Sequence, residues 1–222
     1  MTYQDQQRPV KRIVNRTNVY VDGFNLFYGA LKGSPYKWLN LEALCNHLLP
    51  KDTMHRIRYF TAKVSARPDD PQLPIRQDAY LRALATLRTV SVHLGVFYVS
   101  IARAPLAHPP ATGPKTVEVI KTEEKGSDVA LATYLMLDAC RSDCDTAVLI
   151  TNDSDLREPL RLVRDELGLV TGVINPHKAG RRSRALQATF FKQLRPSALA
   201  ASQFPRQVTD SDGRTISKPA SW

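Results

Sequence analysis

Short apolar runs alternate with segments of helical periodicity along most of this chain, and this alternation limits the folds open to it. The most hydrophobic run, residues 146–151, carries no charge, which is typical of a central parallel strand covered on both faces. Residues 18–21 form a second such run. A strand-then-helix order requires right-handed crossovers between parallel strands. The sequence therefore predicts an α/β fold with a doubly wound, Rossmann-like sheet.

The individual elements follow from the same periodicities. We expect strands at residues 18–22, 57–64, 90–101, 116–121, 146–151 and 170–174, and helices at residues 24–31, 41–48, 72–88, 127–140 and 156–167. Asn40 and Ser127 are suited to cap the helices that begin beside them. Four prolines and a glycine between residues 104 and 114 predict a loop.

The chain of 222 residues has the length of one α/β domain with tails. We expect a basic, flexible N-terminal arm over residues 1–16, a single domain over residues 17–195 and a polar C-terminal tail over residues 196–222. No apolar run reaches the roughly 20 residues that span a bilayer, and the N-terminus lacks the apolar core of a secretory signal. Three cysteines, an odd number, favour a reducing compartment. We therefore expect a cytoplasmic protein without membrane contact.

Four aspartates follow the predicted strands or begin the helix after one. Asp22 comes directly after residues 18–21, Asp128 lies at the start of the helix 127–140, and Asp153 and Asp155 follow residues 146–151. Because the carboxyl ends of parallel strands meet at one edge of a sheet, these side chains can converge there. Carboxylates held close together need a counter-charge, and Mg²⁺ or Mn²⁺ prefer oxygen ligands. A metal pocket in a chain of formal net charge +10 suggests a polyanionic substrate, with nucleic acid as the leading class.

Three segments around these aspartates resemble the signature blocks of the NYN domain family, which belongs to the PIN-like nucleases. They are Tyr20-Val21-Asp22-Gly23-Phe24-Asn25-Leu26, Lys125-Gly126-Ser127-Asp128-Val129-Ala130-Leu131-Ala132 and Thr151-Asn152-Asp153-Ser154-Asp155-Leu156, in the order of the family. The resemblance covers about residues 17–195. It implies a PIN-like, three-layer α/β/α sandwich with a mostly parallel central sheet and a metal-dependent endoribonuclease activity with Mg²⁺ or Mn²⁺.

The resemblance also implies roles for particular residues. Asp22, Asp128, Asp153 and Asp155 would hold the metal, and Asn25 would hydrogen-bond a metal-bound water or the scissile phosphate. Together these five residues would form the catalytic site. The substrate is expected to be RNA. A homodimer and a regulatory protein partner are both compatible with the sequence.

Further residues are candidates for RNA binding. Lys125 can clamp a phosphate, and Ser127 and Ser154 lie at helix starts, where hydroxyl and backbone N–H groups favour anions. Between His177 and Arg195 there are six cations and no acidic residue, from which we select Lys178, Arg181, Arg182 and Arg184 as phosphate contacts. The alternative for this stretch is a solvated surface helix. Three aromatic residues near the first helix, Tyr28, Tyr36 and Trp38, could together form a surface on which bases stack.

One departure from the family keeps two other functions open. Many relatives have an aspartate where this chain has Tyr134, so the number of carboxylates at the site is in question. A non-catalytic RNA-binding module with the same fold is the alternative that Tyr134 favours. A small-molecule phosphohydrolase is the other, but such enzymes place Asp-x-Asp after the first strand, whereas this chain has Asp22-Gly23-Phe24.

Overall fold

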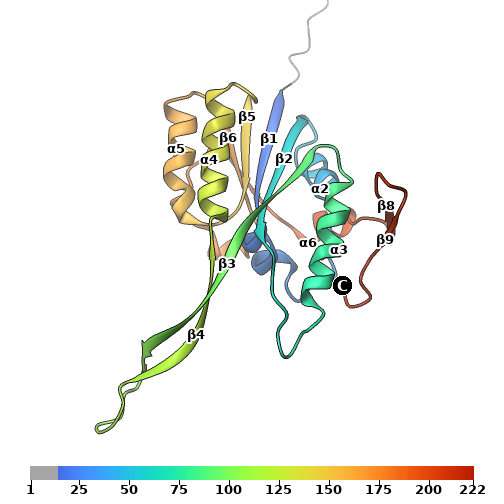
Figure 1. The fold of residues 1–222 in the computed structure, drawn as a ribbon. Coiled ribbons are helices and arrows are strands. Elements are labelled where there is room, and N and C mark those ends of the chain that lie inside the picture. Colours follow the sequence, from blue (N-terminus) through green and yellow to red (C-terminus); the bar gives the residue numbers. More distant parts are fainter. Residues whose placement is uncertain (1–14) are drawn as a thin grey trace, which may run out of the picture.

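The computed structural model describes residues 15–222, so the predicted N-terminal arm lies almost entirely outside the described residues. A seven-stranded sheet in the order β4-β3-β2-β1-β5-β6-β7 forms its centre (Figure 1). All neighbouring strands are parallel except β3 and β4, which are antiparallel. The strands are β1 (Arg16–Asp22), β2 (Thr53–Ala62), β3 (Val90–Pro105), β4 (Thr116–Lys125), β5 (Thr146–Ile150), β6 (Val170–Asn175) and β7 (Phe190–Gln193).

Helices cover both faces of the sheet, which confirms the predicted three-layer α/β/α sandwich. One face carries α2 (Leu41–Leu48), α3 (Leu73–Ala85) and α6 (Pro196–Ala201), and the other carries α4 (Ser127–Cys140) and α5 (Arg157–Asp165) (Figure 1). Four short helices, α1 (Gly23–Leu26), η1 (Phe27–Leu31), η2 (Ser154–Leu156) and η3 (Ala179–Arg181), follow strands or connect elements. A separate hairpin is formed by β8 (Gln207–Thr209) and β9 (Thr215–Ser217).

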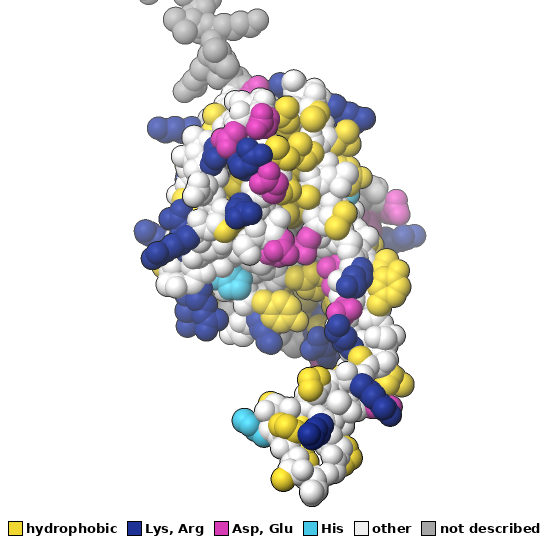
Figure 2. Space-filling view, turned by 90° about the vertical axis from the view of Figure 1, so that its left-hand side faces the viewer, with side chains coloured by type: hydrophobic (Ala, Val, Ile, Leu, Met, Phe, Trp, Pro, Cys, Tyr) yellow, Lys and Arg dark blue, Asp and Glu magenta, His cyan; other side chains and the backbone are white. Residues whose placement is uncertain are grey.

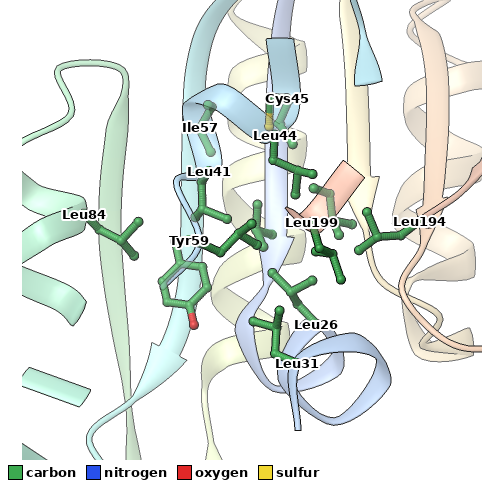
Figure 3. Close-up of a cluster of buried hydrophobic side chains, with 14 of the residues drawn as sticks. Leu26, Leu31, Leu41, Leu44, Cys45, Ile57, Tyr59, Leu84, Leu194 and Leu199 are labelled. Carbon is green, nitrogen blue, oxygen red and sulfur yellow. The ribbon is translucent and has the colours of Figure 1, made fainter. Parts of the chain in front are cut away.

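The central strand β1 is buried on both faces, as the uncharged run of residues 18–21 predicts. Val19 and Val21 pack into the core beneath α2, α3 and α6, part of which is drawn in Figure 3. Tyr20 points to the opposite face and packs with residues of α4 and α5. This alternation follows from the two-residue period of a strand. It fixes the register of β1, so that Asp22 lies where the strand leaves the sheet.

A buried ion pair joins α4 to the sheet. The guanidinium of Arg58 donates to both carboxylate oxygens of Asp138, at 2.7 and 2.8 Å, and the Tyr20 hydroxyl donates to the same carboxylate at 2.9 Å. These bonds satisfy a carboxylate that is almost fully buried, without which its charge would be costly. Asp138 therefore has a structural position near the last turn of α4, remote from the helix start that carries Asp128.

The largest difference from prediction is a two-stranded arm, residues 96–125, that projects from the body (Figure 1). Here β3 and β4 pair from Val96–Lys125 to Pro105–Thr116, so both strands are longer than predicted and the loop is shorter. The arm exposes large apolar side chains, among them Val99, Ile101 and Ile120. Its strands are held by cross-strand hydrogen bonds rather than by a core, which is why burial patterns underestimate their length.

Three smaller predictions need correction or extension. The helix 24–31 is α1 followed by one π-helical segment. Strand β7 is not among the predicted strands, because it lies in the stretch 177–195, which was interpreted as a basic RNA-binding segment with a surface helix as the alternative. The start of α4 is capped by Gly126 rather than by Ser127, since the chain there has a positive φ of 98°, which glycine tolerates.

Residues 196–222, expected to be a polar tail, contain α6 and the β8–β9 hairpin. The ring of Trp222 lies 5.7 Å from that of Tyr80 and 6.4 Å from that of Trp38, measured between ring centroids. This last segment is therefore packed on the domain. Along residues 15–222, none of the helices combines the length and the apolar composition needed to cross a membrane.

Candidate metal centre

Three aspartates meet at the carboxyl edge of the sheet. Asp22 ends β1, Asp153 lies just beyond the neighbouring strand β5, and Asp128 is in the first turn of α4. One carboxylate oxygen from each of the three lies within 4.8 Å of the others. We call this group the carboxylate cluster. It brings together residues that are separated by as many as 131 positions in the sequence, as the parallel topology predicts.

Asp22 is the most buried member of the cluster, with 5% of its surface exposed. Its Oδ1 accepts the backbone N–H of Asn25 at 2.9 Å, which caps α1, and its Oδ2 accepts the hydroxyl of Thr151 at 3.0 Å. Burial raises the pKa of Asp22 to about 6, and the carboxylates of Asp128 and Asp153 add to this increase, while the two hydrogen bonds oppose it. Asp22 is thus held in place by neutral donors that do not neutralise its charge.

Asp128 shows the same effect. Burial is the largest cause of its raised pKa, followed by the negative charges of Asp153, Glu124 and Asp155. Nearby carboxylates disfavour one another's ionised forms, and a divalent cation removes this repulsion. The donors are carboxylate oxygens alone, a set that suits Mg²⁺ or Mn²⁺. The residues present therefore fit the kind of metal ion that the sequence predicts.

Asp155 lies beside the cluster and is not one of its three members. Its side chain is exposed, and its backbone N–H donates to Oδ1 of Asp153 at 3.0 Å. Asp153 thereby caps η2 with the same carboxylate that it presents to the cluster. The role of Asp155 as a metal ligand stays a prediction. The geometry favours Asp22, Asp128 and Asp153 over Asp155 as ligands.

Asn25 connects the loops around the cluster. Its Oδ1 accepts the backbone N–H of Asn152 at 2.9 Å and lies 3.0 Å from Nε2 of His177. The side-chain carbonyl is therefore engaged within the protein, which leaves the NH₂ group of Asn25 for a phosphate or a water. His177 had no predicted role in the sequence beyond marking the start of the basic stretch. Its proximity to Asn25 depends on the pairing of β1, β5 and β6, which no local motif encodes.

The remaining predicted RNA contacts near the cluster are Lys125, Ser127 and Ser154, and the first two lie at or just before the start of α4. Glu124 accepts both the hydroxyl of Ser127, at 2.7 Å, and its backbone N–H, at 3.1 Å. Ser127 is buried, so its hydroxyl serves this turn. Lys125 is exposed, with its Nζ 3.4 Å from a carboxylate oxygen of Glu123. Ser154 is also exposed, at the first position of η2, where Asp153 is the capping residue.

A basic loop, residues 178–184, follows β6 at the same edge of the sheet. Its four predicted RNA contacts are all exposed: Lys178, Arg181, Arg182 and Arg184. Asn152, which directly precedes Asp153, holds this loop through two hydrogen bonds. Its Nδ2 donates to the carbonyl of Arg181 and its Oδ1 accepts the N–H of Ser183, both at 2.7 Å. Figure 2 shows acidic side chains in the middle of one face, with Lys and Arg side chains around them.

Not every cation of the stretch 177–195 belongs to this loop. Lys192 lies on β7 and donates to the carbonyl of Leu48 at the end of α2, so it stabilises a helix end. Phe190 and Phe191 are partly buried and pack against the two cores. The guanidinium of Arg182 lies 3.6 Å above the ring of Phe191. The interpretation of these two rings as core residues is therefore favoured over base stacking.

Tyr134, where the resemblance to the family implies an aspartate, packs on the sheet. Its ring centroid lies 4.3 Å from that of His93 and 6.0 Å from that of Phe60, and the guanidinium of Arg58 lies 4.6 Å from it. The aromatic ring thus fills space between α4 and the strands β2 and β3. The cluster of three carboxylates forms without a contribution from this position.

The fold and the carboxylate cluster define the class of protein. The NYN domain model matches residues 16–194, so the chain belongs to the NYN domain family. The resemblance deduced from the three sequence blocks is thereby confirmed.

Two particular proteins are similar to this chain. A curated relative is 32% identical over 238 residues, which cover 93% of this chain and 75% of the relative; it is the 6-hydroxy-3-succinoylpyridine 3-monooxygenase HspA of Pseudomonas putida. Among solved structures, a protein of unknown function, VPA0982, from Vibrio parahaemolyticus matches with a TM-score of 0.51 at 13% identity, covering 86% of this chain and 97% of that one. The second similarity concerns the fold alone.

Proposed function

We propose that this protein is a metal-dependent endoribonuclease that hydrolyses phosphodiester bonds of RNA at the carboxylate cluster. The observation that carries the proposal is the convergence of Asp22, Asp128 and Asp153 within 4.8 Å at the carboxyl edge of the sheet. Membership of the NYN domain family supports the same activity. Mg²⁺ or Mn²⁺ held there would supply Lewis-acid chemistry and stabilise the negative charge that develops during hydrolysis.

The residues of the chain have separate tasks in this proposal. Asp22, Asp128 and Asp153 hold the cation, and Thr151 and the backbone of Asn25 keep the Asp22 carboxylate in position through hydrogen bonds at 3.0 and 2.9 Å. Asp155 adds negative charge at the outer side of the cluster. Lys125 and the basic loop would bind the phosphates that flank the scissile bond, since arginine and lysine orient a nucleic-acid backbone without reading its sequence.

RNA is favoured over a small phosphorylated substrate by charge and position. The chain has a formal net charge of +10, and Asn152 joins the basic loop directly to the loop of Asp153. A positive surface beside an acidic pocket attracts a polyanion and then concentrates it near the metal. A single small phosphate ester would need fewer cations than this loop presents.

A second candidate function rests on the relative from Pseudomonas putida, whose name describes a monooxygenase that acts on a substituted pyridine. The similarity extends over 93% of this chain, so oxygenation of a small heteroaromatic compound is the competing activity. The donor set of the cluster argues for hydrolysis instead. The two-histidine, one-carboxylate site of mononuclear non-haem iron oxygenases differs from the cluster found in residues 15–222, which consists of aspartates.

One experiment separates these functions. The purified full chain is incubated with labelled single-stranded RNA in Mg²⁺, in Mn²⁺ and in EDTA, next to the variants Asp22→Asn and Asp153→Asn. Asp78→Asn serves as the matched control, since Asp78 is an exposed carboxylate on α3 paired with Arg82. A parallel assay measures oxygen consumption with 6-hydroxy-3-succinoylpyridine and a two-electron reductant, which a monooxygenase reaction requires.

Metal-dependent cleavage that is lost in both cluster variants and retained in Asp78→Asn supports the nuclease. Binding of RNA without cleavage in any metal would point to a non-catalytic RNA-binding module. Substrate-dependent oxygen consumption without RNA cleavage would replace the nuclease by the second candidate.

A further inference from the structure

A cavity of about 250 Å³ lies next to the carboxylate cluster, on the face of the sheet that carries α3. We call it the aromatic pocket, because six aromatic rings from different parts of the chain line it: Phe24, Phe27, Tyr28, Tyr59, Tyr80 and Trp222. Of the residues considered above for the metal or for RNA, only Tyr28 lines this cavity, and Trp38, which was considered with it, is fully buried. The pocket therefore needs an explanation of its own.

The rings are arranged from a buried floor to an exposed mouth. Tyr59 and Tyr80 are buried and meet edge to face at 6.2 Å, and Trp222 packs against Tyr80 at 5.7 Å. Tyr28, in contrast, has 52% of its surface exposed. Aromatic walls of this kind favour a flat ring that stacks on one side and meets ring edges on the other. The Tyr28 ring meets that of Phe27 edge to face at 5.3 Å, and its exposed part remains open to a ligand.

The mouth of the pocket is positively charged. Lys32, Lys37 and Arg67 line it, and none of the three takes part in the ion pairs found among residues 15–222. The ammonium of Lys32 lies 5.1 Å above the ring of Tyr28. Two acidic residues also line the pocket, of which Asp70 is paired with Arg76 and Asp69 is exposed, so the cations outnumber the unpaired acidic group by three to one. The free cations suit a ligand whose ring is attached to an anionic group.

Two consecutive residues of the chain belong to the carboxylate cluster and to the pocket. Gly23, which lines the pocket, directly follows Asp22 in the sequence. The Tyr59 ring packs so closely on Gly23 that a Cβ at this glycine would lie 2.8 Å from Tyr59 Cζ and 2.6 Å from the carbonyl oxygen of Phe60. The backbone that lines the pocket at Gly23 is therefore continuous with the residue that carries the most buried carboxylate of the cluster.

From these features we propose that the aromatic pocket binds one nucleobase of single-stranded RNA, with the adjoining phosphate at Lys32, Lys37 and Arg67, and so places a neighbouring phosphodiester at the carboxylate cluster. This inference rests on the proposed ribonuclease function and adds a base-binding subsite to it. The volume is slightly below the roughly 300–1,000 Å³ of pockets for drug-sized ligands, so it suits a single ring system. Base stacking on aromatic side chains is tolerant of sequence, so the pocket selects unpaired bases rather than a particular base.

Tryptophan fluorescence tests binding independently of catalysis. The chain has two tryptophans, Trp38 and Trp222. Trp222 lines the pocket, and the centroid of the Trp38 ring lies 6.4 Å from the centroid of the Trp222 ring. The full chain in EDTA is titrated with adenosine monophosphate, with adenosine, with a short single-stranded oligoadenylate and with a duplex that contains the same strand. Cleavage does not contribute to this readout, because EDTA removes the divalent cation.

We expect the oligoadenylate to quench the fluorescence and to bind more tightly than adenosine monophosphate, which in turn binds more tightly than adenosine. Tyr28→Ala should weaken oligoadenylate binding about 5- to 150-fold, the range for loss of one base–aromatic stack, and Tyr28→Phe should restore it. The duplex should not compete. Tyr98→Ala is the matched control, since Tyr98 is a 60% exposed tyrosine on the arm and outside the pocket.

Absence of quenching by both adenylates would overturn the proposal, as would unchanged binding by Tyr28→Ala or equal affinity for the single strand and the duplex. Its failure is distinguishable from failure of the nuclease. RNA cleavage that is indifferent to Tyr28 leaves the nuclease and removes the subsite. Tyr28-dependent quenching without cleavage in Mg²⁺ or Mn²⁺ leaves the subsite and removes the nuclease.

Discussion

Replacement of Asp22 by asparagine should stabilise the metal-free protein. Burial and the neighbouring carboxylates raise the pKa of Asp22 from 3.8 to about 6. Because one pKa unit corresponds to about 1.4 kcal/mol, ionised Asp22 costs the folded state about 3 kcal/mol. Asparagine has no charge, and its Oδ1 can still accept the N–H of Asn25. We expect a gain of about 1–3 kcal/mol at neutral pH, or a rise in Tm of about 2–12 °C for a domain of this size.

The sign of the pH dependence follows from the direction of the pKa change. Below about pH 4 Asp22 is protonated in both the folded and the unfolded state, so the substitution gains nothing. Between about pH 4 and pH 6 the folded state binds more protons than the unfolded state, so the stability of the wild type falls as the pH rises. Above about pH 6 the full cost is present. The advantage of Asp22→Asn should therefore appear across this interval and then stay constant.

The assay is chemical denaturation of both proteins in EDTA at several pH values, followed by thermal melts with added Mg²⁺ or Mn²⁺. A cation at 100 times its Kd should stabilise the wild type by about 2.7 kcal/mol and Asp22→Asn by much less. Asp78→Asn should behave as the wild type throughout. If Asp22→Asn were no more stable than the wild type near neutral pH in EDTA, the hydrogen bonds from Asn25 and Thr151 would outweigh the repulsion, and the reasoning would be refuted.

Three further predictions concern packing, the buried ion pair and RNA binding. Gly23→Ala should cost about 1–3 kcal/mol of unfolding free energy because its Cβ has no room, whereas Gly180→Ala, with no atom within 4 Å of its Cβ, should stay within about 0.5 kcal/mol. Asp138→Ala should lower the free energy of unfolding by about 3–5 kcal/mol, because it leaves the Arg58 charge buried and unpaired. Asp78→Ala, on the surface, should lower it by about 0.5 kcal/mol or less. Equal losses in the two variants would contradict the structural role of Asp138. Each neutralised cation of the basic loop should reduce the slope of log affinity for single-stranded RNA against log salt by about 0.7, measured by titration in EDTA, and unchanged slopes would place the RNA elsewhere.

The sequence predicts the centre of the molecule well because local patterns and topology agree there. The uncharged runs that became β1 and β5 are buried on both faces, and each is followed by an aspartate at the edge of the sheet. Once parallel strands are inferred, the meeting of Asp22 with Asp153 is a consequence of topology. Asp128 joins them because the helix that follows β4 starts at the same edge.

The periphery is less predictable, for identifiable physical reasons. The arm is stabilised by pairing between its own strands while both carry exposed apolar side chains, so burial patterns say little about its length. Strand β7 depends on pairing with β6 across a loop, and the aromatic pocket depends on Trp222 returning to Tyr80 from the far end of the chain. Such contacts are set by tertiary packing and not by any short motif.

The position of β1 between β2 and β5 has a consequence for biosynthesis. The strand is made early, but its partner β5 and the aspartate beyond it emerge from the ribosome only after the segments that form β2, β3, the arm and α4. A nascent chain that stops short of β5 lacks one of the three acidic groups altogether. The capacity to bind a divalent ion therefore arises late in translation. It requires that β5 has already paired with β1, which joins the two halves of the sheet.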